Sequence, residues 1–212
     1  IEIDNKPMIQ WVIESLKLEG NYIFIVQKEH QEKYNINSVL KILKPNCKII
    51  ELDHITEGAA CTTLLAKKFI NTNHPLIIAN SDQYIKWDSI KSMYNYNQKK
   101  IDGSILTFEA IHPKWSYAKT DKNNFVTEVA EKKVISKNAT VGVYYWKKGS
   151  DYVNCAETMI KKNVRVNNEF YVCPVYNEAI GEGRKIVIDK VLEMHGLGTP
   201  DDLKNFITKK NL

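Results

Sequence analysis

The chain has 212 residues, of which 43% are hydrophobic and 26% charged, and its formal net charge is +5 at pH 7. The composition is ordinary for a globular protein, and the length suits one domain with a sizeable core. The lysines are scattered as pairs rather than massed on one segment, which argues against a nucleic-acid partner. No apolar run reaches the roughly 18 residues that a membrane span needs, so we expect no membrane partner.

The four cysteines carry no metal or redox motif. They stand at Cys47, Cys61, Cys155 and Cys173, and none forms a C-x-x-C pair or lies in a His/Cys cluster with zinc spacing. Unpaired thiols are typical of a reducing compartment, so we expect a cytoplasmic protein.

The first half of the chain alternates helices with short apolar strands. In chain order the patterns predict a helix at 8–16, a strand at 22–26, a helix at 31–43, a strand at 47–52, a helix from 59 to 69 and a strand at 76–79. Continuous apolar runs of this kind are typical of buried parallel strands. The alternation therefore predicts an α/β domain with a mostly parallel sheet flanked by helices.

The second half predicts a mixed β insertion and further helices. We expect a strand at 103–109, a hairpin over 117–129, a strand at 140–146, helices at 150–161 and 169–180, a strand at 184–189 and a last helix at 200–207. No repeat or flexible linker interrupts the chain, so we predict one domain over 1–212.

Asp82 is the first candidate functional residue, because it follows the predicted strand 76–79. Ligands of open parallel sheets lie outside the carboxyl ends of the strands, and a carboxylate there can hold Mg²⁺. On position alone, a turn or a helix cap is an equally good interpretation.

Two further segments could carry chemistry. Gly58, between a strand and a helix, permits close approach to an anion or a base edge, although a simple connection is the alternative. Lys132, after the hairpin, could neutralise a phosphate, although an exposed, solvated lysine is the default interpretation.

Seven segments occur in an order that resembles one known family. They are IDNKPMI from Ile3, TEGA from Thr56, NSDQ from Asn80, the hairpin YAKT to FVTEVAEK from Tyr117, ATVGVYY from Ala139, NEFYVCP from Asn168 and GLGTPDDL from Gly196. The order is similar to that of the sugar-phosphate nucleotidyltransferases (pyrophosphorylases) over essentially the whole chain. The likeness is strongest to the branch found in capsule and lipopolysaccharide gene clusters.

The resemblance implies a Rossmann-like nucleotide-diphospho-sugar transferase fold and Mg²⁺-dependent transfer of a nucleotidyl group from a nucleoside triphosphate to a phosphorylated sugar or similar metabolite, with release of pyrophosphate. By position, it implies catalytic roles for Asp82 and Lys132, with Asp82 as the metal ligand. It implies nucleotide contacts at Thr56, Glu57, Gly58, Ala59, Ser81 and Asp82. It implies substrate contacts at Glu131, Lys132, Gly142 and Glu169. The sequence leaves the oligomeric state open, with a homo-oligomer among the expectations.

The chain departs from the family pattern in three places. The family opens with a strand and a glycine-rich phosphate loop that do not precede Ile1 here, so we expect an N-terminally incomplete chain that lacks its first strand. Gly196 stands where many relatives carry a metal-binding aspartate, unless Asp189 or Glu193 substitutes for it. Ala118 stands where relatives often have glycine.

Two alternatives remain at this point. A nucleotide-sugar-dependent glycosyltransferase of similar fold could use Ser81 and Asp82 as half of an Asp-x-Asp metal motif. A non-catalytic binding or regulatory homologue would account for Gly196 and the missing loop. The order of the segments favours the nucleotidyltransferase, with surface polysaccharide precursors as the expected products.

Overall fold

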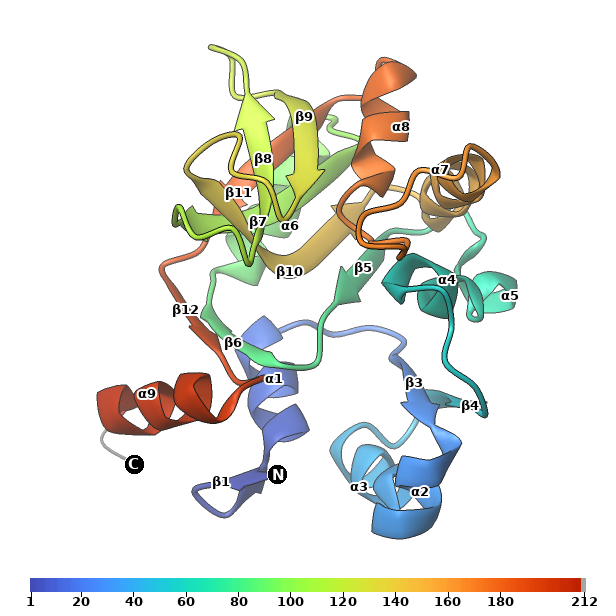
Figure 1. Ribbon diagram of the computed structural model, residues 1–212, viewed down its shortest axis with the longest axis vertical. Coiled ribbons are helices and arrows are strands. Elements are labelled where there is room, and N and C mark those ends of the chain that lie inside the picture. Colours follow the sequence, from blue (N-terminus) through green and yellow to red (C-terminus); the bar gives the residue numbers. More distant parts are fainter. Residues whose placement is uncertain (211–212) are drawn as a thin grey trace.

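The computed structural model describes residues 1–210 and shows an α/β fold with a mixed sheet flanked by helices (Figure 1). The central sheet is formed by the strands β5 (Leu76–Ala79), β7 (Gly103–Glu109), β8 (Ser116–Thr120), β9 (Val126–Glu131), β10 (Asn138–Trp146) and β11 (Ile186–Lys190). The predicted mixed sheet with flanking helices is thus confirmed.

The strand pairs of this sheet are mostly antiparallel, so the expectation of a mostly parallel sheet was wrong. The physical reason is β10, which returns from the hairpin β8–β9 and lies antiparallel to β5, β7 and β8. Within the central sheet of the described chain, only β11 and β7 pair in parallel. The register of β10 against β7 shifts between Thr140 and Tyr144, which places a bulge around Gly142.

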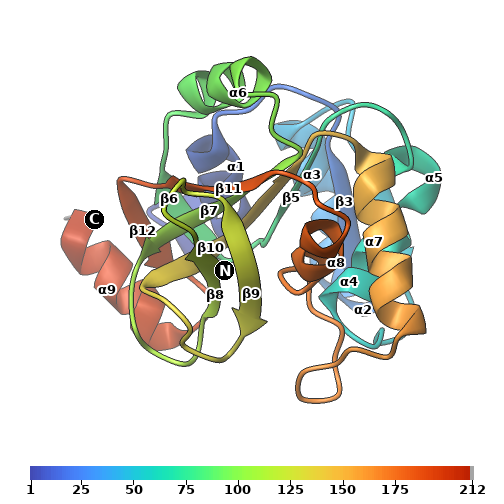
Figure 2. The same ribbon diagram turned by 90° about the horizontal axis from the view of Figure 1, so that it is seen from above.

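Helices cover the sheet on both sides, as the view from above shows (Figure 2). On one side lie α4 (Ala59–Leu64), α5 (Lys67–Ile70), α7 (Gly149–Lys161) and α8 (Val175–Gly181), and on the other lie α1 (Met8–Leu16) and α6 (Ser89–Gln98). The core beneath α7 and α8 is aromatic: the Trp146 and Tyr176 rings stack with centroids 4.3 Å apart. The Tyr176 hydroxyl donates a 2.8 Å hydrogen bond to the Tyr145 carbonyl, and this bond offsets the cost of burying the hydroxyl.

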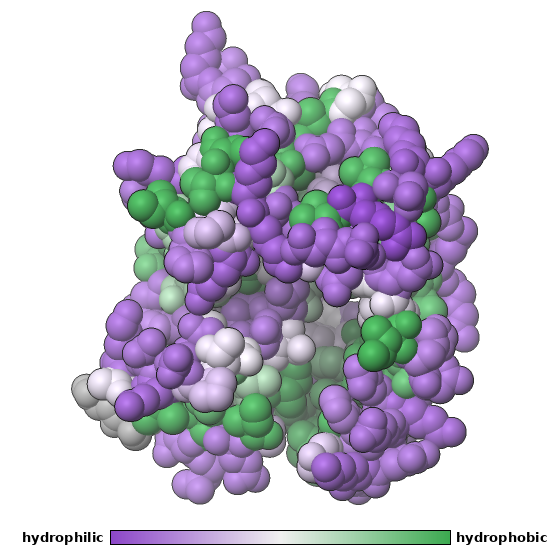
Figure 3. All heavy atoms as spheres, in the orientation of Figure 1, coloured by the Kyte–Doolittle hydropathy of each residue, from purple (hydrophilic) through white to green (hydrophobic). Residues whose placement is uncertain are grey.

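A separate parallel pair lies beside the central sheet. β3 (Ile23–Gln27) and β4 (Lys48–Leu52) pair with each other and carry α2 (Lys28–Tyr34) and α3 (Ile36–Leu43). Within residues 1–210, neither strand pairs with the central sheet. A groove of about 370 Å³ separates β3 from β5. Apolar side chains at its base are visible at the lower centre of Figure 3.

The C-terminal part forms a small layer against α1. The short strands β1 (Glu2–Ile3) and β2 (Lys6–Pro7) precede α1, and β12 (Glu193–Gly196) pairs antiparallel with β6 (Gln83–Lys86) before α9 (Pro200–Lys210). Trp11 and Phe206 pack edge to face with ring centroids 5.4 Å apart, which joins α1 to α9. Across residues 1–210, none of the helices is both long and apolar enough to cross a membrane.

Several predicted elements differ in detail. The structure confirms the helix at 8–16 and the strand at 76–79. The helix predicted over 31–43 divides at Asn35, whose φ of 50° lies in the left-handed region. The helix predicted over 169–180 begins only at Val175, because the backbone of Glu169 pairs with Val166 and that of Phe170 pairs with Glu57 and Ala60.

Candidate functional site

A pocket of about 410 Å³ opens between the hairpin β8–β9, strand β10 and the layer formed by β6, β12 and α9. Its lining includes Asp82, Glu131, Lys132, Gly142 and Ala59, five of the positions that the sequence singled out. Residues far apart in the chain therefore meet at one place.

Asp82 lies in the loop that connects β5 to β6, and backbone contacts fix this loop on both sides. Asn80 N–H donates to the Gly142 carbonyl at 2.8 Å, and Leu197 N–H donates to the Asp82 carbonyl at 2.7 Å. The carboxylate faces Gly198, where a Cβ would lie 2.5 Å from Asp82 Oδ2. Desolvation by the surrounding atoms raises the pKa of Asp82, and the nearby charge of Asp202 adds to the effect.

Gly142 is required by the shape of the site. Its φ of +77° belongs to the left-handed region, and a Cβ would lie 2.5 Å from Nδ2 of Asn80. Glycine therefore permits both the bulge in β10 and the position of the Asn80 side chain.

Glu131 ends strand β9, Lys132 follows it, and both line the same pocket. The Ser116 hydroxyl donates a hydrogen bond to Glu131, whose pKa is raised by desolvation. Lys132 Nζ donates to the Tyr171 hydroxyl at 2.7 Å and lies 4.8 Å from the centre of that ring. The hydrogen bond to Tyr171 raises the pKa of Lys132, which keeps its ammonium group charged.

The segment from Thr56 to Ala59 reaches the pocket only at Ala59. Thr56 Oγ1 donates to the Gly58 carbonyl at 3.0 Å, and a Cβ on Gly58 would lie 2.6 Å from the backbone N and O of Phe170. The close approach that Gly58 permits is thus to the backbone of Phe170, and a contact to the nucleotide base stays a prediction.

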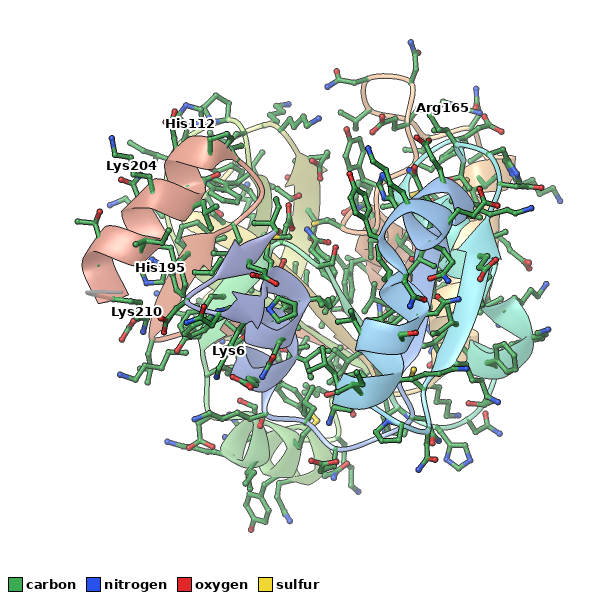
Figure 4. All side chains as sticks on the ribbon, turned by 90° about the horizontal axis from the view of Figure 1, so that it is seen from below. Lys6, His112, Arg165, His195, Lys204 and Lys210 are labelled. Atoms are coloured by element: carbon green, nitrogen blue, oxygen red, sulfur yellow. The ribbon has the colours of Figure 1, made fainter. Side chains whose placement is uncertain are left out.

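Glu57 is also turned away from the pocket. Its carboxylate pairs with Arg165, which comes from the loop between α7 and α8. Figure 4 shows Arg165 on the side of the molecule away from His195 and Lys210, which lie at β12 and α9.

Ser81 and Glu169 do not line the pocket. Ser81 lines the groove between β3 and β5, on the other side of its loop. Glu169 lies outside the lining, but its charge acts on the neighbouring Lys132 and Tyr171 and contributes to their pKa shifts.

Asp189 and Glu193, which the sequence offered as substitutes for a carboxylate at position 196, lie elsewhere. Asp189 Oδ2 accepts hydrogen bonds from three side chains, those of Ser92 and Tyr96 on α6 and that of Trp87 just before it. Glu193 pairs with Lys86 and Lys210 at the surface. Neither lines the pocket, so that expectation was wrong.

The pocket lining also includes polar side chains that sequence reasoning did not assign to the site, among them Lys114, Tyr171, Gln83 and Asp202. Asp202 carried a readable pattern, because Thr199 begins the motif [ST]-x-x-[DE] that predicts a capping box at a helix start. The structure shows one bond of this box, in which Asp202 N–H donates to Thr199 Oγ1 at 3.2 Å, while Asp202 Oδ2 accepts from the Thr199 hydroxyl at 2.7 Å.

The donors at this end of the pocket suit a hard divalent cation. Asp82, Asp202 and Gln83 all offer oxygen atoms, the ligands that Mg²⁺ prefers. Within residues 1–210, no group of three or more His, Cys, Asp or Glu side chains could hold a metal alone. A bound cation would therefore share its coordination with water or with substrate phosphates.

Comparisons with known proteins bear on the family and the fold. The family model described as "Nucleotidyl transferase" matches residues 1–200. A search of curated protein sequences finds no match.

Solved structures resemble the fold along nearly its whole length. A nucleoside-diphosphate-sugar pyrophosphorylase from Vibrio cholerae RC9 is 21% identical, with a TM-score of 0.81 over 98% of this chain and 90% of that chain. A putative glucose-1-phosphate thymidylyltransferase from Bacillus anthracis is 15% identical, with a TM-score of 0.74 over 97% and 82%. The inositol-1-phosphate CTP transferase from T. maritima is 13% identical, with a TM-score of 0.74 over 99% and 83%. At these identities the likeness supports the Rossmann-like fold and leaves the substrate undetermined.

Proposed function

Because the chain belongs to the nucleotidyl transferase family, we propose that it transfers a nucleotidyl group from a nucleoside triphosphate to a phosphorylated sugar or a similar phosphorylated metabolite. The observation that carries the proposal is the presence of Asp82 and Lys132 in one pocket of about 410 Å³. An acidic group that can bind a cation and a lysine that can bind a phosphate are what two phosphate-bearing substrates require.

The proposed reaction is an in-line displacement at phosphorus. An oxygen of the acceptor phosphate forms a bond to the α-phosphorus of the triphosphate, and the bond from that phosphorus to the bridging oxygen breaks. Pyrophosphate leaves with the electron pair of that bond. The protein contributes mainly by positioning and charge neutralisation, since such transfers need little covalent help.

We assign roles to three of the pocket residues. Lys132 binds the acceptor phosphate, and Tyr171 holds its ammonium group in place. Glu131, oriented by Ser116, accepts a hydrogen bond from a hydroxyl of the acceptor. Asp82 binds Mg²⁺, which would neutralise phosphate charge and orient the triphosphate when bound.

The remaining sequence-based positions support the pocket. Ala59 borders the nucleotide, while Thr56, Glu57 and Gly58 fix its segment against Phe170. Ser81 and Glu169 do not line the pocket: Ser81 borders the neighbouring groove, and the charge of Glu169 acts on Lys132. We further propose a cytoplasmic location and products used for surface polysaccharide precursors, on the strength of the family resemblance.

A panel of triphosphates and phosphorylated acceptors tests the function, with released pyrophosphate as the readout. We expect release only when a divalent cation, one triphosphate and one phosphorylated acceptor are all present. Asp82→Asn should lower turnover by at least about a hundredfold, as expected where charge stabilisation dominates. Asp53→Asn is the matched control, because Asp53 pairs with His54 at the surface and does not line the pocket.

The alternatives make different predictions in the same assay. A glycosyltransferase would consume a nucleotide sugar and release a nucleoside diphosphate, without pyrophosphate. A non-catalytic homologue would bind a triphosphate without turnover. Either result would overturn the proposed function.

A further inference from the structure

The carboxylate of Asp202 occupies the space beside Gly196. A Cβ on Gly196 would lie 3.1 Å from Cγ and 3.2 Å from Oδ2 of Asp202. The capping bond from Thr199 holds the carboxylate there. A carboxylate on the side chain of residue 196 and that of Asp202 would therefore compete for the same place.

Gly198 leaves room for the carboxylate of Asp82, as Gly196 does for that of Asp202. Its absent side chain leaves room for Oδ2 of Asp82, at 2.5 Å from the position that a Cβ would take. The two glycines flank Leu197, whose N–H binds the Asp82 carbonyl. One short loop thus makes room for two carboxylates that come from different elements.

Gln83 supplies an independent indication of a ligand. Its side chain is 2% exposed and lines the same pocket, and its Nε2 donates to the Asn80 carbonyl at 2.8 Å. That bond leaves Oε1 buried, without a hydrogen-bond partner within residues 1–210. A buried, unpartnered carbonyl oxygen is costly, and a cation or its bound water would satisfy it.

Lys114 partly balances the charge of Asp202. Lys114 Nζ lies 3.5 Å from Asp202 Oδ1, and both side chains are partly exposed. An ion pair of this length and exposure contributes little energy, so a bound cation could replace Lys114 beside Asp202.

We propose that Asp82, Asp202 and the amide oxygen of Gln83 form a divalent-cation site, in which Asp202 supplies the carboxylate that residue 196 lacks. The ligands are all oxygen atoms, so the site takes a hard cation such as Mg²⁺ or Mn²⁺. That this cation serves nucleotidyl transfer rests on the proposed function, whereas its binding does not.

Binding of Mn²⁺ to the whole chain tests the site without substrates. The readout is the relaxation rate of water protons during a Mn²⁺ titration, with Mg²⁺ as competitor. We expect Asp82→Asn and Asp202→Asn each to weaken Mn²⁺ binding by about tenfold or more, as expected when a charged ligand is lost. Asp201→Asn is the matched control, because Asp201 is the exposed neighbour of Asp202 on α9.

Moving the carboxylate from residue 202 to residue 196 tests whether Mn²⁺ binding needs a carboxylate at this position in space. Asp202→Ala opens the space beside Gly196, and adding Gly196→Asp to that variant places a carboxylate there. We expect the double variant to recover most of the Mn²⁺ affinity that Asp202→Ala loses. Circular dichroism and thermal melting verify that each variant is folded.

The proposal fails if Asp202→Asn binds Mn²⁺ as the unmodified chain does, or if the double variant recovers nothing. Because no substrate is present, either failure leaves the proposed function untouched. Conversely, Mn²⁺ binding that depends on Asp202 in a chain that never releases pyrophosphate would support the site and reject the function.

Discussion

A methyl group on Gly198 would lie 2.5 Å from Oδ2 of Asp82, so the position of this carboxylate depends on a glycine far along the chain. We predict that Gly198→Ala lowers pyrophosphate release by about tenfold or more, since small displacements of a positioning group cost that much. The backbone of Gly198 is not in the left-handed region, so the fold should tolerate the change. Steady-state turnover and the melting temperature measure the two effects.

Gly181→Ala is the control for Gly198→Ala. A Cβ on Gly181 would meet nothing within 4 Å, and the residue ends α8 at the surface. Its turnover should equal that of the unmodified protein. If Gly198→Ala keeps full turnover, the carboxylate of Asp82 does not need this space.

The pair of Lys132 and Tyr171 leads to a second prediction. Lys132→Met keeps the length of the side chain and removes its charge, which should raise KM for the phosphorylated acceptor by about tenfold, because charged hydrogen bonds contribute about 1.5–3 kcal/mol. Tyr171→Phe removes only the hydroxyl that orients Lys132 and should have a smaller effect. KM and kcat for both substrates separate these contributions.

Lys133→Met is the matched control, since Lys133 is exposed and adjacent in sequence but does not line the pocket. It should leave both constants unchanged. Equal losses in the Lys132 and Lys133 variants would instead indicate a general effect of surface charge.

Gly142 and Asn80 are predicted to be coupled in stability. Gly142→Ala should lower the free energy of unfolding by roughly 1–3 kcal/mol, because its φ of +77° and its contact to Asn80 both oppose a side chain. Adding Asn80→Ala to Gly142→Ala removes the crowded contact between the two side chains but leaves the backbone strain at residue 142. Urea denaturation of both single variants and the double variant should therefore show partial rescue, and strict additivity would contradict the crowded contact.

Glu131 gives a prediction about pH. Desolvation raises its pKa in the folded state, a bond from Ser116 and the charge of Lys132 oppose the rise, and the charge of Glu169 adds to it. A raised folded pKa means that ionisation costs stability as pH rises above the unfolded value. Glu131→Gln should therefore gain stability relative to the unmodified protein between about pH 4 and about pH 7. Urea denaturation of both proteins at the two pH values measures this gain in the free energy of unfolding. A gain that shrinks as the pH rises would contradict the prediction.

The fold class could be predicted because hydrophobic periodicity is local. Apolar spacing located the helix at 8–16 and the strand at 76–79 without any knowledge of their neighbours. Strand direction depends on pairing between distant segments, so the antiparallel position of β10 had no local pattern to reveal it.

The candidate site was predictable only in part, for a similar reason. Asp82 stood out because it follows a strand, and Lys132 because it follows a hairpin. Asp202 was not singled out, because the pattern from Thr199 to Asp202 indicates only the start of a helix, where the two residues do bond to each other. The Asp202 carboxylate also fills the space beside Gly196, and the pairing of β12 with β6 sets Gly196 opposite Gln83; both relationships exist only in three dimensions.

The groove between β3 and β5 bears on the expectation that a strand is missing from the sheet, which stays a prediction. Asn80 N–H donates to β10, so by the alternation of strands the N–H of Ile78 also faces β10. The N–H groups of Ile77 and Ala79 then face the groove. Within residues 1–210, no strand pairs with that edge of β5.

Hydrogen exchange resolved by residue tests whether anything covers this edge. In the 212-residue chain we predict that the Ile77 and Ala79 amides exchange much faster than the Ile78 and Asn80 amides, because only the latter pair is bonded to β10. The two pairs alternate along one strand, so each serves as the control for the other against general unfolding. Equal protection of all four amides would show that another segment or a second copy of the chain already pairs with the open edge.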